Sequence, residues 1–204
     1  MKTNVIQVSF ILLVGCTTNT NNQPIVEHRS ISDHESISKQ HAIAEQKCIG
    51  DTYISGALAN DFKPIDDDNL LHKALGAPDE GGLCSGQVYI SQEHTKIVIS
   101  RAWNSTNPAS KLGQWWAFST PKGSIAKYRE DYEICYQWSP LDKMISCKLK
   151  PGTKVVVGAG QSAKCSEYLN YPVSAQQQIY IENAKSAVLE CVEFDGQFSW
   201  QPSK

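Results

Sequence analysis

The residues best placed to do chemistry in this sequence are polar side chains at the ends of apolar, strand-like runs. Arg101 and Ser119 each follow such a run, Thr120 comes directly after, and Gln178 leads into a later run. An arginine can pair with two oxygens of a phosphate or carboxylate in fork geometry, which a lysine cannot copy. A glutamine can orient a hydroxyl group, but its neutral amide cannot act as a general base. These residue types suit the binding and orientation of a ligand better than proton transfer.

Aromatic residues adjoin these polar positions. Trp116 and Phe118 lie just before Ser119, and Tyr128 and Arg129 follow on the next predicted helix. An aromatic ring can stack on a planar ligand and exclude water from it. The same rings could instead fill the core of a small domain, so both interpretations stay open here.

The common catalytic and metal-binding motifs are absent from the sequence. It contains no Gly-x-Ser-x-Gly, no P-loop and no His-Glu-x-x-His. The acidic triplet Asp66–Asp68 is better explained by helix capping, so we expect no metal centre. The segment Gly158–Ala163 lacks the third glycine of a dinucleotide-binding loop. Four of the five histidines precede the first predicted strand, and His94 lies in the turn after it, which disfavours a histidine-based triad. The histidines are His28, His34, His41, His72 and His94.

Six cysteines in the body of the chain indicate up to three disulfides, because an even number in an exported protein is typical of bridged cysteines. They contain no Cys-x-x-Cys pair and have no histidine at a ligand spacing, so a zinc site is not expected. A helix end and the following strand could bring Cys135 and Cys147 together, which makes this pair the favoured one. The candidates are Cys48, Cys84, Cys135, Cys147, Cys165 and Cys191.

The N-terminus has the pattern of an export signal. Residues 1–15 combine a cationic start with a short apolar run, which is too short to span a bilayer. Its last residues with Cys16 resemble the bacterial lipobox, which implies cleavage before Cys16 and acylation of that cysteine. The same resemblance implies, from Thr17, a lipid-anchored protein of the cell envelope at the outer membrane. No later segment is apolar enough to span, so the lipid would be the membrane contact.

The elements that must position the candidate residues follow from the pattern of the remaining chain. Residues 16–33 are a polar tether, and 34–204 form a single domain that opens with a short helix over 34–48. A further helix starts at the acidic triplet and ends at Gly76, and another runs from Ser124 to Gln137. Strands are predicted over 88–90, 96–101, 114–119, 144–149, 153–157, 176–181 and 187–194.

This order of elements predicts an α+β domain with one or two helices packed on a small, mostly antiparallel sheet. The chain has 204 residues, of which 41% are hydrophobic and 20% charged, so it can build one ordinary core and is not disordered. A formal net charge of -2 argues against a nucleic-acid partner, because such proteins normally carry a basic excess.

Over residues 87–194 the order of the candidate residues resembles the ADP-ribosyltransferase fold. The shared order is an arginine at one strand, an aromatic strand ending in Ser119-Thr120, and Gln178 before a late strand. A glutamine at this position resembles the pattern of the secreted NAD-glycohydrolase toxins of this superfamily, in which a glutamine stands where the transferases have a glutamate. The resemblance implies an enzyme, although the residues alone leave open whether the chain is catalytic.

The resemblance also implies roles for individual residues, with NAD as substrate. Ser119 would position the nicotinamide, Gln178 would orient the ribose, and the bond between them would break through an oxocarbenium-like state. A neutral amide at this place favours water over a protein as acceptor. The NAD-binding residues would be Arg101 on the pyrophosphate, with Thr120, Trp116, Phe118 and Arg129.

Two non-catalytic functions remain as alternatives. An envelope lipoprotein could bind glycan or peptidoglycan through exposed tryptophans, or could inhibit a toxin or lysozyme with the loop Gly158–Cys165. The first requires at least two coplanar exposed tryptophan rings, and the second requires Gln161 on a protruding loop. The enzyme requires Arg101, Ser119 and Gln178 to converge on one cleft.

Overall fold

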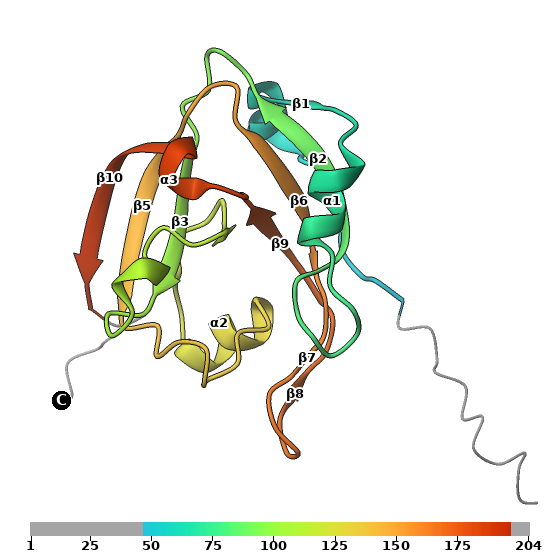
Figure 1. Cartoon of the computed structure of the whole chain (residues 1–204), viewed down its shortest axis with the longest axis vertical. Coiled ribbons are helices and arrows are strands. Elements are labelled where there is room, and N and C mark those ends of the chain that lie inside the picture. The colour runs from blue at the N-terminus through green and yellow to red at the C-terminus, as the bar shows by residue number, and fades with distance from the viewer. Residues whose placement is uncertain (1–46, 197–204) are drawn as a thin grey trace, which may run out of the picture. The chain divides into compact units, whose positions relative to one another are not determined.

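A computed structural model describes residues 47–196 of the chain (Figure 1). The predicted signal peptide, Cys16, the tether and all but the last two residues of the predicted helix over 34–48 lie outside this range. In the described part, no helix has the length and apolar character needed to cross a membrane.

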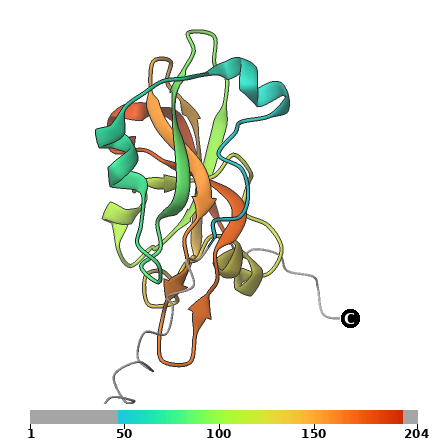
Figure 2. The same cartoon turned by 90° about the vertical axis from the view of Figure 1, so that its right-hand side faces the viewer.

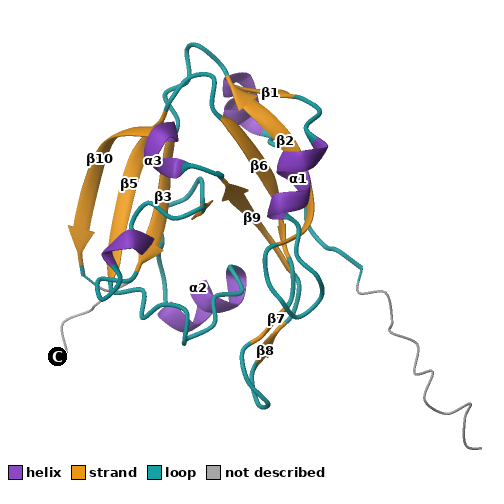
Figure 3. Ribbon diagram, in the orientation of Figure 1, coloured by secondary structure: helices purple, strands orange, loops and turns teal. Residues whose placement is uncertain are grey.

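The described strands form two main antiparallel sheets that face each other (Figure 3). The larger has the order β1-β2-β6-β9-β4, and the smaller has the order β10-β5-β3. One bridge between Ser100 and Ala117 connects them, through two backbone hydrogen bonds of 2.9 Å. The larger sheet contains β1 (Phe62–Pro64), β2 (Leu83–Ser91), β6 (Lys154–Gly160), β9 (Ser174–Tyr180) and β4 (Trp115–Trp116). The smaller contains β10 (Val188–Asp195), β5 (Lys143–Leu149) and β3 (Val98–Trp103).

A separate hairpin extends the end of the larger sheet. It consists of β7 (Ala163–Lys164) and β8 (Asn170–Tyr171), and it projects from the body in both views (Figure 2). The sequence predicts a loop from Gly158 to Cys165, but β6 and β7 occupy most of this segment.

Short helices cover the sheets and the space between them. They are η1 (Gly56–Asp61), α1 (Asp68–Ala74), η2 (Pro108–Ser110), α2 (Ile125–Asp131) and α3 (Ala184–Ala187). Two helix starts are confirmed: the side chain of Asp67 accepts from the backbone of Leu70 at 3.1 Å, and Ser124 caps α2. However, α2 ends six residues before the predicted end at Gln137. Glu133 has a φ of 47°, a left-handed conformation that cannot continue a right-handed helix.

Two apolar layers hold these elements together. In β6, Val155 and Val157 pack between the two sheets, while Val156 packs on the opposite face beneath α1. Side chains of a strand alternate between faces, so a strand covered on both sides is apolar throughout. The α+β class with mostly antiparallel sheets is therefore confirmed.

Three disulfides are present, but the favoured pairing of Cys135 with Cys147 is wrong. Cys147 lies on β5 and is bonded to its neighbour β10, whereas Cys135 follows α2 and lies against the β7–β8 hairpin. Spacing along the chain cannot reveal these partners, because both bridges connect segments that meet only in the folded sheets. The pairs are Cys48–Cys84, Cys135–Cys165 and Cys147–Cys191.

Candidate active or binding cavity

A cavity of about 210 Å³ lies between the two sheets, next to α2. Figure 1 shows α2 at one end of the space between β3 and β9. An engineered cavity of about 150 Å³ is enough for benzene, so this one accommodates a single ring with small substituents. Six of its sixteen lining residues are aromatic and two are charged. The lining residues are Gly82, Arg101, Ala102, Trp103, Asn104, Ser110, Trp115, Trp116, Tyr128, Tyr132, Glu133, Ile134, Trp138, Ser139, Leu141 and Gln178.

Arg101 on β3 supplies the positive charge of the cavity. Its Nε and Nη1 atoms are buried and have no hydrogen-bond partner among residues 47–196. The guanidinium lies 5.7 Å from the ring centre of Trp116, and a Cβ atom at Gly113 would come within 2.4 Å of Nη1. The absence of a side chain at Gly113 therefore leaves room for the guanidinium. Burial lowers the pKa of Arg101 to about 10. A buried cation without a partner is costly, so its retention calls for an explanation.

Glu133 supplies the second titratable group of the cavity, and it is not among the residues predicted from the sequence. The residue is only 2% exposed, and its Oε2 atom accepts a hydrogen bond of 2.6 Å from Nε2 of Gln178. Its Oε1 atom is buried without a partner in the described part of the chain. Desolvation raises the pKa of Glu133 to about 9, so the carboxyl is protonated at neutral pH.

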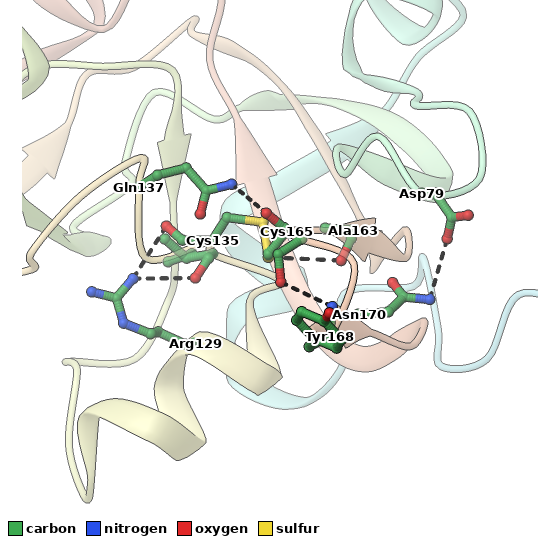
Figure 4. The surroundings of a disulfide bond; sticks show 10 residues. Asp79, Arg129, Cys135, Gln137, Ala163, Cys165, Tyr168 and Asn170 are labelled. Carbon is green, nitrogen blue, oxygen red and sulfur yellow. Dashed lines mark hydrogen bonds between the residues drawn. A yellow bond between two sulfur atoms is a disulfide. The ribbon is translucent and has the colours of Figure 1, made fainter.

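The position of Glu133 is tightly constrained. A Cβ atom at Gly160 would come within 2.0 Å of its Oε2 atom, so the glycine makes room for the carboxyl. Two residues later Cys135 is bonded to Cys165, which ties the segment after α2 to the β7–β8 hairpin (Figure 4). Arg129 completes this anchor by donating to the carbonyls of Ile134, Cys135 and Ser139. The only sequence signal for such a role is a glutamate two residues before a bridged cysteine.

The hairpin side of this anchor is also hydrogen-bonded. Nε2 of Gln137 donates to the carbonyl of Cys165 at 2.8 Å, and Nδ2 of Asn170 donates to the carboxylate of Asp79 at 3.4 Å (Figure 4). Trp138 also lines the cavity, and its backbone N–H donates to the carbonyl of Cys135 at 3.0 Å. The disulfide therefore holds the segment that contributes Glu133 and Trp138 to the cavity wall.

The structure brings together some of the residues selected from the sequence. Arg101, Trp116 and Gln178 all line the cavity. Ser119 does not: it lies in a separate surface groove, where its Oγ is 3.4 Å from the hydroxyl of Tyr132. The required convergence of Arg101, Ser119 and Gln178 on one cleft is therefore met by two of the three residues.

The remaining candidates lie outside the cavity. Phe118 contacts Phe62 with ring centres 5.7 Å apart at the edge of the main core, and Thr120 is exposed. Arg129 donates its guanidinium hydrogen bonds to backbone carbonyls after α2. These contacts give Arg129 a structural role in holding the segment that carries Glu133.

The features expected for the two non-catalytic alternatives differ from those observed. Trp138 is the one strongly exposed tryptophan among residues 47–196, so these residues present no coplanar exposed pair. Gln161 is 5% exposed, donates to the carbonyl of Gly76 and accepts from the backbone of Ser162. The expectation that Gln161 stands on a protruding loop is wrong, because β6 and β7 bury it.

The cavity therefore combines a cation with two buried nitrogens that lack a hydrogen bond within residues 47–196, a protonated carboxyl and several aromatic rings. Such a set can bind a planar anion and donate a hydrogen bond to it. Residues 47–196 contain no group of three or more histidines, cysteines or acidic residues that could hold a metal ion. No family model matches the sequence, and neither the curated proteins nor the solved structures yielded a match.

Proposed function

We propose that this protein binds a small anionic ring compound in the cavity beside α2. The observation that carries this proposal is the guanidinium of Arg101, with two buried N–H groups that lack a partner in the described chain. Buried donors without acceptors destabilise a fold, whereas a carboxylate could accept from the buried Nη1 together with the adjacent Nη2 of Arg101 in fork geometry. The ligand would thus supply an acceptor that the described chain does not.

The shape of the cavity limits the rest of the ligand. About 210 Å³ accommodates one substituted ring, and Trp103 and Trp116 give it aromatic walls. Aromatic walls favour a planar ligand through stacking or edge contacts. A single-ring carboxylate such as benzoate meets both requirements.

The test is a titration of the detergent-solubilised, oxidised full chain with benzoate and with uncharged benzamide. Quenching of tryptophan fluorescence reports binding, since four tryptophans line the cavity, and calorimetry measures it independently. We expect benzoate to bind at least tenfold tighter than benzamide, because hydrogen bonds to charged groups contribute about 1.5–3 kcal/mol. Arg101→Met should abolish this preference, and the control Lys63→Met, on an exposed strand position, should retain it. No binding of benzoate at millimolar concentration would overturn the proposal.

A second proposal is cleavage of NAD by an ADP-ribosyltransferase-like domain. The observation that favours it is the presence of Arg101, Trp116 and Gln178 in one cavity. The volume suits the nicotinamide ring, so the rest of the dinucleotide would extend outside. This proposal has less support than the first, because Ser119 lies outside the cavity.

To test it, NAD is incubated with the oxidised full chain, and the nicotinamide released is measured by chromatography. Gln178→Ala should abolish the release, and Gln176→Ala, at an exposed position of the same strand, should leave it intact. Absence of release from the folded protein would remove the enzyme from consideration and leave the binding proposal untouched.

A further inference from the structure

We propose that Glu133 is a second recognition group of the cavity, which selects ligands whose ring carries a hydrogen-bond acceptor. This inference rests on the proposed binding function and narrows the ligand class to heteroaromatic carboxylates, of which the pyridine carboxylates are the simplest. Arg101 would bind the carboxylate, and Glu133 would donate to the ring nitrogen.

The hydrogen bonds of the carboxyl identify the atom that donates. Oε2 of Glu133 accepts from the amide of Gln178 at 2.6 Å, so this oxygen acts as the acceptor. In a protonated carboxyl the proton then lies on Oε1, which is buried and has no partner among residues 47–196. A buried O–H group without an acceptor is unfavourable, and Glu133 lines the cavity. A ligand atom with a lone pair would satisfy it.

The surroundings keep this carboxyl neutral. From α2, Asp131 raises the pKa of Glu133 by charge repulsion, and from β9, Gln178 lowers it through its hydrogen bond to Oε2. The hydroxyl of Ser174, also on β9, lowers this pKa too, and it donates to the carbonyl of Asp131 at 2.8 Å. Tyr132 is the adjacent titratable group, and no cation forms an ion pair with Glu133 in the described chain. Burial is the largest effect, so the neutral donor form prevails at pH 7.

The backbone holds Glu133 in a conformation that it would not choose by itself. A φ of 47° is uncommon for a residue with a side chain, and here it closes α2, with the backbone N–H of Ile134 donating to the carbonyl of Arg129 at 2.9 Å. Gly160 leaves the space for the carboxyl, and the disulfide from Cys135 fixes the segment. These features fix the donor in place before a ligand arrives, which lowers the entropic cost of binding.

Four single-ring carboxylates of similar size test this inference: benzoate and the three pyridine carboxylates, with nitrogen in the ortho, meta or para position. Each is titrated into the oxidised full chain at pH 7. We expect one pyridine isomer to bind about five- to tenfold tighter than benzoate, because only one nitrogen position lies within reach of Glu133. Glu133→Gln keeps a donor and should keep the preference, whereas Glu133→Leu should bring the ratio of pyridine to benzoate affinity to one.

Raising the pH of the wild-type titration distinguishes donation from a structural role. Above pH 9 the ionised carboxylate cannot donate, so the ratio of pyridine to benzoate affinity should fall towards one. Glu133→Gln cannot ionise and should keep its ratio at the same pH. Equal binding of all four compounds at pH 7 would overturn the role of Glu133 and leave the binding proposal standing. Failure of all four to bind would overturn both.

Discussion

Replacing Arg101 by methionine should stabilise the fold while removing ligand binding. Methionine has a similar length and is apolar, so it fills the same space without a charge that must be desolvated. In the described chain, two of the guanidinium nitrogens are buried without a hydrogen bond. The buried charge therefore lowers the free energy of unfolding of the ligand-free protein, and the methionine variant would not have this loss of stability.

The magnitude follows from the pKa of the guanidinium. Burial lowers it from 12.5 to about 10, and each unit corresponds to about 1.36 kcal/mol, which gives an upper limit of about 3 kcal/mol. Because the residue is partly exposed, solvent screening reduces the expected gain to about 1–2 kcal/mol. For a chain of this size that gain raises the melting temperature by roughly 2–8 °C.

The lowered pKa of Arg101 determines how the stability gain of the methionine variant depends on pH. A base whose pKa is lowered in the fold destabilises it at every pH below the folded pKa, so the cost is fully present below about 10. Urea unfolding of oxidised wild type, Arg101→Met and the control Lys63→Met should show the gain in the first variant alone. The gain should shrink as the pH rises through 10.

The outcome that refutes this reasoning is a loss of stability in Arg101→Met by 1 kcal/mol or more (~1 kcal/mol is a typical net hydrogen bond). Such a loss would mean that the guanidinium is satisfied in the free protein. Adding benzoate gives an independent check, since bound ligand stabilises only a protein that binds it. Wild type should gain stability with benzoate and Arg101→Met should not.

Two further predictions concern the wall of the cavity. Burial raises the pKa of Glu133 from 4.5 to about 9, so stability should fall as pH rises between these values, and Glu133→Gln should remove this slope in urea titrations. Replacing both Cys135 and Cys165 by serine should cost about 3–4 kcal/mol and abolish benzoate binding, whereas the same change at Cys48 and Cys84 should cost a similar amount and retain binding. Unimpaired binding in the first double variant would disprove the anchoring role.

Local features of the fold could be predicted from the sequence because their causes are local. The cap at Asp67, the cap at Ser124 and most strands follow from residue type and alternation. The end of α2 could not be predicted, since the periodic pattern continues beyond the helix. Glu133 takes the left-handed conformation that closes the helix, with the backbone N–H of Ile134 donating to the carbonyl of Arg129 at 2.9 Å, at a position where no glycine marks the end in the sequence.

In the candidate site, too, the residue types could be predicted from the sequence, but their meeting in space could not. Arg101 and Gln178 were selected as polar residues at strand ends, and both reach the cavity. Ser119 was selected by the same reasoning and does not, because β4 ends at Trp116 and the chain then crosses to pair with β3 at Ala117. Which strand ends meet depends on pairing between distant segments, and a pattern within one segment does not contain that information.

The central place of β6 has a kinetic consequence. Its neighbour β2 ends at Ser91, β6 begins only at Lys154, and most of the smaller sheet's strands lie between them. Bringing together segments so distant in the chain costs conformational entropy before any contact is formed. This cost slows folding to the scale of about milliseconds to seconds. Thiols close in sequence, such as those of Cys135 and Cys147, can form a non-native disulfide during that delay. In an oxidising compartment, such a bond would have to be exchanged for the native ones before folding is complete.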